Sequence, residues 1–192
     1  MDELELSKQC LQGINLAREE LYKQYSGRLF SLCLRYTGSR EEAQDLLQDG
    51  FLKIFRSFDK FTWRGKGSLR AWMEKVMVNV ALQAIRKDKA MGYSISLDEI
   101  PETSFDQEVE EPDEADVDAI SESELLQYIS ELPVGYRTVF NLYIFEEKSH
   151  KEIAQILGIN EKSSSSQLLR ARRLLAKRIA ARGEKISDES EG

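Results

Sequence analysis

The sequence predicts an all-α protein made of two small helical domains joined by a flexible acidic linker. Apolar residues recur at three- and four-residue steps along most of the chain, which is the period of a helix. Three prolines and eleven glycines in 192 residues leave little turn material for a β fold. The charge is also segregated. Between Ala90 and Tyr136 there is no lysine or arginine but fourteen of the 34 acidic residues, so the rest carries 27 basic and 20 acidic residues despite a net charge of −7.

The first predicted domain spans residues 1–92 and begins with two helices. A stripe of Leu21, Tyr25, Leu29 and Leu32 predicts a helix over residues 14–36. Gly38 can end this helix in the left-handed conformation. Ser39, followed by Glu42 three residues later, then forms a capping box for a second helix that runs to about Phe58.

A loop and a long helix complete this domain. The loop, residues 59–67, reads DKFTWRGKG and mixes aromatic and basic residues. We expect Ser68 to cap the helix that follows. The expected buried stripe of that helix is Leu69, Trp72, Val76 and Val80, and the helix ends in a basic cluster at residues 86–89.

Residues 93–120 lack apolar periodicity and are rich in aspartate and glutamate. Mutual repulsion and the small number of apolar side chains favour an extended linker. The second predicted domain then spans residues 121–183, and residues 184–192 form a polar tail.

The second domain shows a helix-turn-helix pattern. A capping box at Ser121 starts its first helix, Pro133 and Gly135 break the chain, and a second helix is expected over residues 136–145. Another capping box at Ser149 starts a short helix that Gly158 stops. Residue 160, an asparagine, then caps a last helix that runs to about residue 182.

Composition argues against several functions. The chain has two cysteines, Cys10 and Cys33, and one histidine, His150, so we expect no metal site, no cofactor and no enzyme activity. The cysteines are expected to be free thiols. No apolar run is long enough to span a membrane, and the acidic N-terminus does not resemble a secretory signal. A cytoplasmic protein is therefore expected.

The last helix has the composition of a DNA-reading helix. Its first turns carry four serines and Gln167, which can hydrogen-bond to base edges or phosphates in the major groove. Arginines follow and can contact phosphates. A solvated basic helix is the alternative, but serine is a poor helix former, so four in a row indicate a function.

Two other segments each allow two interpretations of their function. In the loop, Phe61 and Trp63 stand beside Arg64 and Lys66, which suits the stacking and charge neutralisation of single-stranded DNA; alternatively, the rings close the core. The helix over residues 45–55 could dock a partner helix, or it could present an ordinary solvated face.

Two long runs resemble a known family. The run from Tyr25 to Lys87, beginning YSGRLFSLCLRYTGSREEAQDLLQDGFLKIF, is similar to region 2 of the extracytoplasmic-function (ECF) sigma factors, which belong to the sigma-70 family. The run from Glu131 to Ile179, containing SHKEIAQILGINEKSSSSQLLRARRLLAKRI, is similar to their region 4. Order, spacing and a short linker also match, over most of the chain.

The resemblance implies three sets of site residues. The set for binding the RNA polymerase clamp is Asp45, Gln48, Asp49, Phe51 and Lys53. The set for melting and reading the −10 element as single-stranded DNA is Phe61, Trp63, Arg64, Lys66, Arg70 and Asn79. The set for the duplex −35 element is Ser163, Ser165, Ser166, Gln167, Arg170, Arg173 and Lys177.

The resemblance therefore implies an alternative sigma factor that binds core RNA polymerase and promoter DNA, with an anti-sigma protein as a further partner. A helix-turn-helix regulator that binds duplex DNA without polymerase is the main alternative; it would be expected to dimerise, and no dimerisation heptad is evident. A helical enzyme is a second alternative, disfavoured by the single histidine and the lack of a glycine-rich phosphate loop.

Overall fold

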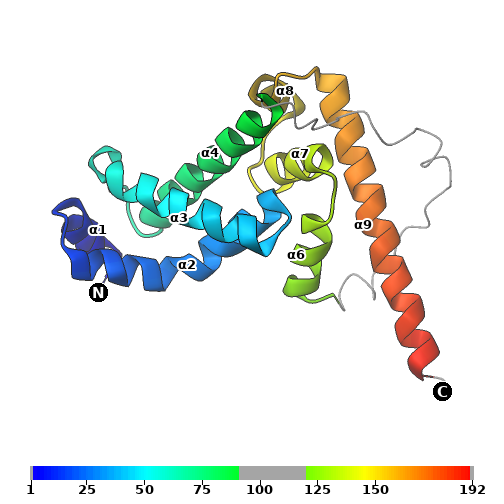
Figure 1. Ribbon diagram of the computed structural model, residues 1–192, viewed down its shortest axis with the longest axis horizontal. Helices are drawn as coiled ribbons and strands as arrows, with labels where there is room; N and C mark the ends of the chain where they lie inside the picture. The colour runs from blue at the N-terminus through cyan, green and yellow to red at the C-terminus, as the bar shows by residue number, and fades with distance from the viewer. Residues whose placement is uncertain (1, 91–119, 191–192) are drawn as a thin grey trace. The chain divides into compact units, whose positions relative to one another are not determined.

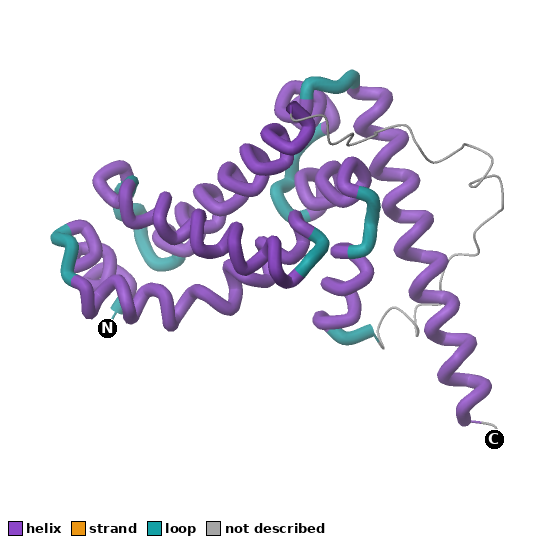
Figure 2. The backbone as a smooth tube through the Cα atoms, in the orientation of Figure 1, coloured by secondary structure: helices purple, strands orange, loops and turns teal. Residues whose placement is uncertain are grey.

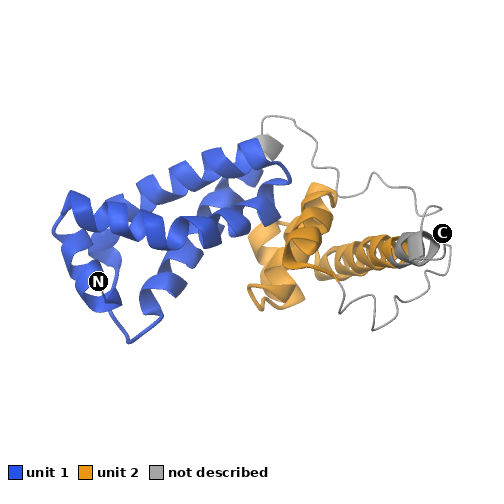
Figure 3. Cartoon of the chain, turned by 90° about the horizontal axis from the view of Figure 1, so that it is seen from below, with its two compact units in different colours: residues 1–93 blue, residues 94–192 orange. Residues whose placement is uncertain are grey.

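The computed structural model describes residues 2–90 and 120–190, with side chains for 2–87 and 120–182. The chain divides into two compact units, residues 1–93 and 94–192 (Figure 3). The described residues form helices and loops and include no strand (Figure 2). The predicted all-α class with two helical domains is therefore confirmed. The acidic linker lies almost wholly at 91–119, outside the described residues, and the domain boundaries stay a prediction.

The first unit is a helical bundle with an additional helix at its N-terminus (Figure 1). Its elements are α1 (Glu3–Leu11), α2 (Asn15–Thr37), α3 (Arg40–Arg56), the 3-10 turn η1 (Phe58–Lys60) and α4 (Ser68–Ala90). Helices α2, α3 and α4 pack on one another, and α1 packs on α2 and η1.

Helix α1 was not predicted from the sequence. Its side chains Leu6 and Cys10 are buried, and Asp2 caps it by accepting a hydrogen bond from the Glu5 N–H at 2.8 Å. Nine residues with only a few apolar positions give a weak periodic signal, and packing on α2 supplies what intrinsic propensity lacks.

The junction of α2 and α3 lies where it was predicted, but Ser39 caps α3 with its own hydroxyl and the capping box predicted with the Glu42 side chain is not formed. Gly38 ends α2 at φ 82°, in the left-handed region, and the Ser39 hydroxyl accepts a hydrogen bond from the Glu42 N–H at 3.1 Å. Further along α3, Gly50 faces α4 so closely that a Cβ there would lie 2.2 Å from the Met77 Sδ. The absence of a side chain at Gly50 lets the two helices approach.

Helix α4 differs from the prediction in two respects. Its buried apolar positions are Leu69, Met73, Met77, Val78, Ala81 and Leu82, so the predicted stripe is shifted. Only Leu69 was right, and Trp72, Val76 and Val80 are half-buried at its edge. Both stripes have helical spacing of three or four residues, and the sequence alone does not say which one faces α2 and α3. The second difference, the identity of the N-terminal cap, is described with the site below.

The second unit consists of α6 (Glu122–Ser130), α7 (Val134–Ile144), α8 (His150–Leu157) and α9 (Glu161–Ser190) (Figure 1). The predicted capping boxes at Ser121 and Ser149 are both present. Gly158 ends α8 at φ 67°, and the Asn160 side chain accepts from the Ser163 N–H at 2.7 Å. Helix, glycine turn and helix thus form the predicted helix-turn-helix.

Two ends in this unit were predicted wrongly. Helix α7 begins at Val134, two residues early, because Pro133 precedes it as the N-cap residue and Gly135 is tolerated in the buried first turn. Helix α9 continues to Ser190, beyond the expected end near residue 182. A single glycine at position 183 disfavours a helix by only about 1 kcal/mol, which is too little to force it to stop.

A buried arginine joins α6 to α7. Arg137 is 5% exposed, and its guanidinium donates to the backbone carbonyls of Ser130 at 2.5 Å and Leu132 at 3.2 Å. Ser130 is the last residue of α6 and Leu132 follows its C-cap. The last carbonyls of a helix lack helical partners, and positive charge there is favourable. Arg137 is therefore a structural residue of this unit.

Candidate nucleic-acid interface

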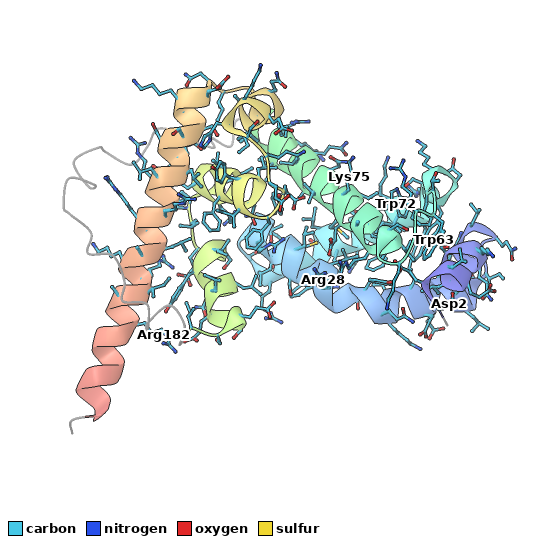
Figure 4. The ribbon with its side chains drawn as sticks, turned by 180° about the vertical axis from the view of Figure 1, so that it is seen from behind. Asp2, Arg28, Trp63, Trp72, Lys75 and Arg182 are labelled. Carbon is cyan, nitrogen blue, oxygen red and sulfur yellow. The ribbon has the colours of Figure 1, made fainter. Side chains whose placement is uncertain are left out.

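The loop between η1 and α4 combines packed rings with exposed charges. Phe58, Phe61 and Trp72 form a cluster, with ring centroids 5.2 Å apart for Phe58 and Trp72 and 5.3 Å apart for Phe61 and Trp72. Trp63 is half-buried, while Arg64 and Lys66 are exposed. Trp63 of the loop and Trp72 of α4 lie in the same part of the unit (Figure 4). Phe61 is half-buried, which fits its packing on Trp72, and its contact with single-stranded DNA stays a prediction.

The start of α4 is capped by a residue that is distant in sequence, Glu3 of α1. The Glu3 carboxylate accepts hydrogen bonds from three backbone N–H groups, those of Gly67 at 2.6 Å, Leu69 at 3.1 Å and Arg70 at 3.4 Å. The predicted cap, Ser68, is the first residue of α4, and its hydroxyl accepts from the Arg64 N–H at 3.2 Å. The prediction of a serine cap is therefore wrong.

The charges around this helix start affect a nearby tyrosine on α2. Burial raises the pKa of the Tyr25 hydroxyl, and the negative charge of Glu3 adds to the rise while the positive charge of Arg70 opposes it.

Arg70 and Asn79, predicted to act together, lie on different sides of α4. Both are exposed, but nine residues at roughly 100° each turn the helix by two and a half revolutions. The side chains that share the Asn79 face are Trp72, Lys75, Gln83 and Arg86. Lys75 and Arg86 were not among the predicted site residues, although their spacing of four and seven residues places them on the Asn79 face.

The four serines that begin α9 have different environments. Ser164 is fully buried, and its Oγ lies 3.0 Å from Nδ1 of His150. The His150 ring in turn stacks on Tyr143 at 4.8 Å. Ser165 is exposed, and Ser163 and Ser166 are half-buried. One serine is therefore explained by packing, and His150 is a structural residue of the helix-turn-helix.

One face of α9 carries the remaining predicted −35 residues. Arg173 and Lys177 are exposed, and Arg170 is half-buried. Gln167 is 2% exposed, so the structure corrects its assignment as a base contact. Leu169, which is 51% exposed on this face, was not predicted.

Two basic residues further along α9 are engaged within the unit. Arg182, labelled in Figure 4, lies on α9 and bonds Glu124 on α6 at 2.8 Å. Arg178 pairs with Glu131, which directly follows α6. The basic side chains of α9 therefore have two kinds of surroundings. Those near its start face solvent, and those further on form ion pairs with Glu124 and Glu131.

Helix α3 presents a separate polar face. Asp45, Gln48, Asp49 and Lys53 are exposed on one side, together with Leu52, which is 52% exposed. Phe51 is 3% exposed and packs on Tyr22 with the two rings tilted and their centroids 4.7 Å apart, so the structure corrects its assignment as a contact residue. Leu52 lies seven, four and three residues after Asp45, Gln48 and Asp49, which is the spacing of one helix face.

Among the described residues, no group of histidine, cysteine, aspartate or glutamate side chains could hold a metal ion. No helix in this part of the chain is long and apolar enough to cross a membrane. Cys10 and Cys33 are free and buried, and burial raises the pKa of their thiols to about 11 and about 12. Both thiols stay protonated near neutral pH and are poor nucleophiles.

Comparison with known proteins gives two family matches and several relatives. Residues 21–91 match Sigma-70 region 2, and residues 122–175 match Sigma-70 region 4. The chain is 30% identical to the ECF RNA polymerase sigma factor SigM of Bacillus subtilis, over 89% of this chain and 98% of that protein. It is 31% identical to the RNA polymerase sigma factor YlaC of the same organism, over 84% and 91%.

Among solved structures, the chain is similar to the one titled "Structure of CnrH in complex with the cytosolic domain of CnrY", with a TM-score of 0.43 and 20% identity over 92% of this chain and 96% of that one. A likeness of this size carries no argument about function.

These matches show a sigma-70-type transcription factor with regions 2 and 4 in order. The chain belongs to the ECF sigma factors of RNA polymerase. It is thus an alternative sigma factor, which directs RNA polymerase in transcription initiation, and not an enzyme. The predicted family, function and non-enzymatic nature are confirmed, and the regulator that acts without polymerase is set aside because region 2 is present.

Proposed function

We propose that the first unit docks on the clamp of core RNA polymerase and captures the opened −10 strand, while the second unit reads the −35 element as duplex DNA. The observation that carries this proposal is the separation of three exposed surfaces over two units of one chain: the α3 face, the loop with the α4 face, and the α9 face.

The −10 surface comprises Trp63, Arg64 and Lys66 on the loop and Trp72, Lys75 and Asn79 on α4. Exposed cations attract the phosphates, and half-buried rings can stack on an unpaired base. Taking a base out of the duplex costs a few kcal/mol, which stacking and hydrogen bonds in the site offset. Asn79 supplies an amide that can donate and accept at a base edge.

The −35 surface is the start of α9 with Ser163, Ser165, Ser166 and Arg170, and with Arg173 and Lys177 for phosphates. The N-terminal turns of the second helix of a helix-turn-helix enter the major groove. Leu169 adds an exposed apolar side chain among them.

The polymerase surface comprises Asp45, Gln48, Asp49, Leu52 and Lys53 on α3. An anti-sigma protein would sequester the factor by covering this face, as the family resemblance implies. Because core RNA polymerase is the partner, the protein would act in the cytoplasm.

Run-off transcription tests the −35 assignment. With core polymerase and a cognate promoter, Arg170→Ala should weaken −35-dependent initiation by about 1–3 kcal/mol and relax base preference at one position if it makes a bidentate base contact. Lys177→Ala is the comparison, because a lost phosphate contact weakens binding to all sequences alike and reduces the salt dependence by about one ion. Wild-type initiation by Arg170→Ala would remove this residue from the reading set.

A further inference from the structure

We propose that Glu3 is a positioning residue for promoter opening. From α1 it fixes the start of α4 and the preceding loop, and thereby holds Trp63, Arg64 and Lys66 in the arrangement that receives the single strand. This inference rests on the proposed role of that loop at the −10 element.

The hydrogen bonds of Glu3 span the boundary between loop and helix. Gly67 belongs to the loop, and Leu69 and Arg70 to the first turn of α4; all three backbone N–H groups donate to this one carboxylate. The first N–H groups of a helix have no partners within it, and the positive end of the helix favours a negative group. Glu3 satisfies both requirements from 64 residues away.

The other hydrogen bonds at the end of the loop join residues close in sequence. Its hydrogen bonds from the Arg64 N–H to the Ser68 hydroxyl and from the Ser68 N–H to the Gly65 carbonyl are local. Gly65 and Gly67 have φ values of 115° and 89°, in the region that favours glycine, and glycines lose the most conformational entropy on ordering. Hydrogen bonds to the fixed Glu3 carboxylate at the end of the loop offset this entropic cost.

Glu3 is itself held in a rigid element. Helix α1 is capped by Asp2 and anchored by Leu6 and Cys10, which are 0% and 1% exposed. The residues that match Sigma-70 region 2 begin at position 21, so α1 lies outside that match. Helix α1 thus connects the DNA-contacting loop to the body of the unit.

The test compares Glu3→Ala with Glu5→Ala in the full-length chain. Glu5 is exposed on the same helix and bonds Gln9, so its loss removes a carboxylate from α1 without touching α4. Loss of an N-cap is equivalent to roughly a 2- to 30-fold change in an equilibrium. We expect hydrogen exchange at the Gly67, Leu69 and Arg70 amides to quicken by about that factor in Glu3→Ala, and wild-type exchange in Glu5→Ala.

Holoenzyme assays supply the functional readout. Open-complex formation, followed by permanganate reactivity of unpaired thymines, should fall by a similar factor in Glu3→Ala, with unchanged affinity for core polymerase. Glu3→Gln keeps a carbonyl acceptor and should recover part of the loss. If Glu3→Ala does not fold, Glu3→Gln tests the inference instead. Its amide exchange and promoter opening should then differ from wild type in the same direction but by a smaller factor.

Several outcomes would overturn the inference: unchanged exchange, normal promoter opening despite faster exchange, or a loss of opening matched by an equal loss of core binding. Variants Trp63→Ala and Arg64→Ala separate it from the proposed function. If these open promoters normally, the −10 role of the loop is wrong; if they fail to open them while Glu3→Ala succeeds, only the positioning role is wrong.

Discussion

Residues with similar sequence signals perform different tasks in this protein. Ser164 and Ser165 are neighbours in a run of four serines, yet one is buried against His150 and the other is exposed. Gly27 and Gly50 both lie inside helices, but a Cβ at Gly27 would meet nothing within 4 Å, while at Gly50 it would overlap Met77. The surroundings of each position, not its residue type, decide what a substitution does.

The two glycines allow a matched prediction. Gly27→Ala should stabilise the first unit by about 0.5–1 kcal/mol, because alanine favours the helix. Gly50→Ala gains the same propensity but must displace Met77, which is fully buried, and overpacking typically costs about 1–3 kcal/mol. We therefore expect a net loss of stability for Gly50→Ala in urea unfolding. Equal stabilisation by both variants would mean that Met77 finds another position at no cost.

At the scale of elements, helix ends in this chain are held by side chains from nearby and from far away. Capping boxes at Ser121 and Ser149 use residues three positions on, whereas α4 depends on Glu3. Glu124 combines both kinds of contact, since it completes the box at Ser121 and bonds Arg182 of α9.

This double role predicts a pH dependence. Hydrogen bonds from the Ser121 hydroxyl and backbone N–H, with a further contribution from Arg182, lower the pKa of Glu124 from 4.5 to about 2. A lowered pKa means that the ionised form stabilises the fold above about pH 4.5, and this contribution is lost as the pH falls towards 2. Glu124→Gln should therefore be less stable than wild type at pH 7, with a difference that shrinks in acid.

Thermal unfolding between pH 7 and pH 2.5 measures that difference. Glu122→Gln, which removes a charge from the same first turn of α6, is the control and should show a smaller gap at pH 7. A gap between wild type and Glu124→Gln that stays constant from pH 7 to pH 2.5 would contradict the assignment.

At the scale of the whole molecule, the function depends on surfaces spread over two units. Asp49 and Gln48 are exposed on α3, and nothing in their surroundings assigns them to the core. Truncating either should reduce affinity for core polymerase by about 1–2 kcal/mol if it lies near the centre of the docking interface. Glu5→Ala is the control, since this exposed residue lies on α1, outside the proposed docking surface.

Affinity for core polymerase, measured by titration of a labelled chain, checks this prediction alongside unfolding curves. Normal unfolding with weaker binding supports the docking surface. Wild-type affinity in both Asp49→Ala and Gln48→Ala would place the interface elsewhere.

The helices of this protein were largely predictable, whereas the directions in which their side chains point were less so. Local signals such as Gly38, Ser39, Gly158 and Asn160 marked helix ends correctly, because each acts on backbone within three or four residues. Phe51 and Gln167 were placed in contact surfaces but are buried, because both positions border a polar face and a packed one.

The sequence by itself determined the helical class, the two charged ends and the family, since these follow from periodicity, composition and motifs that need no partner elsewhere in the chain. Only the tertiary structure decided that Glu3 caps α4, that Met73 and Met77 rather than Trp72 and Val76 line the core, and that Arg178 and Arg182 pair with acids of the α6 segment. Such contacts join residues tens of positions apart, and which residues meet is settled by how helices pack on one another, not by local preference.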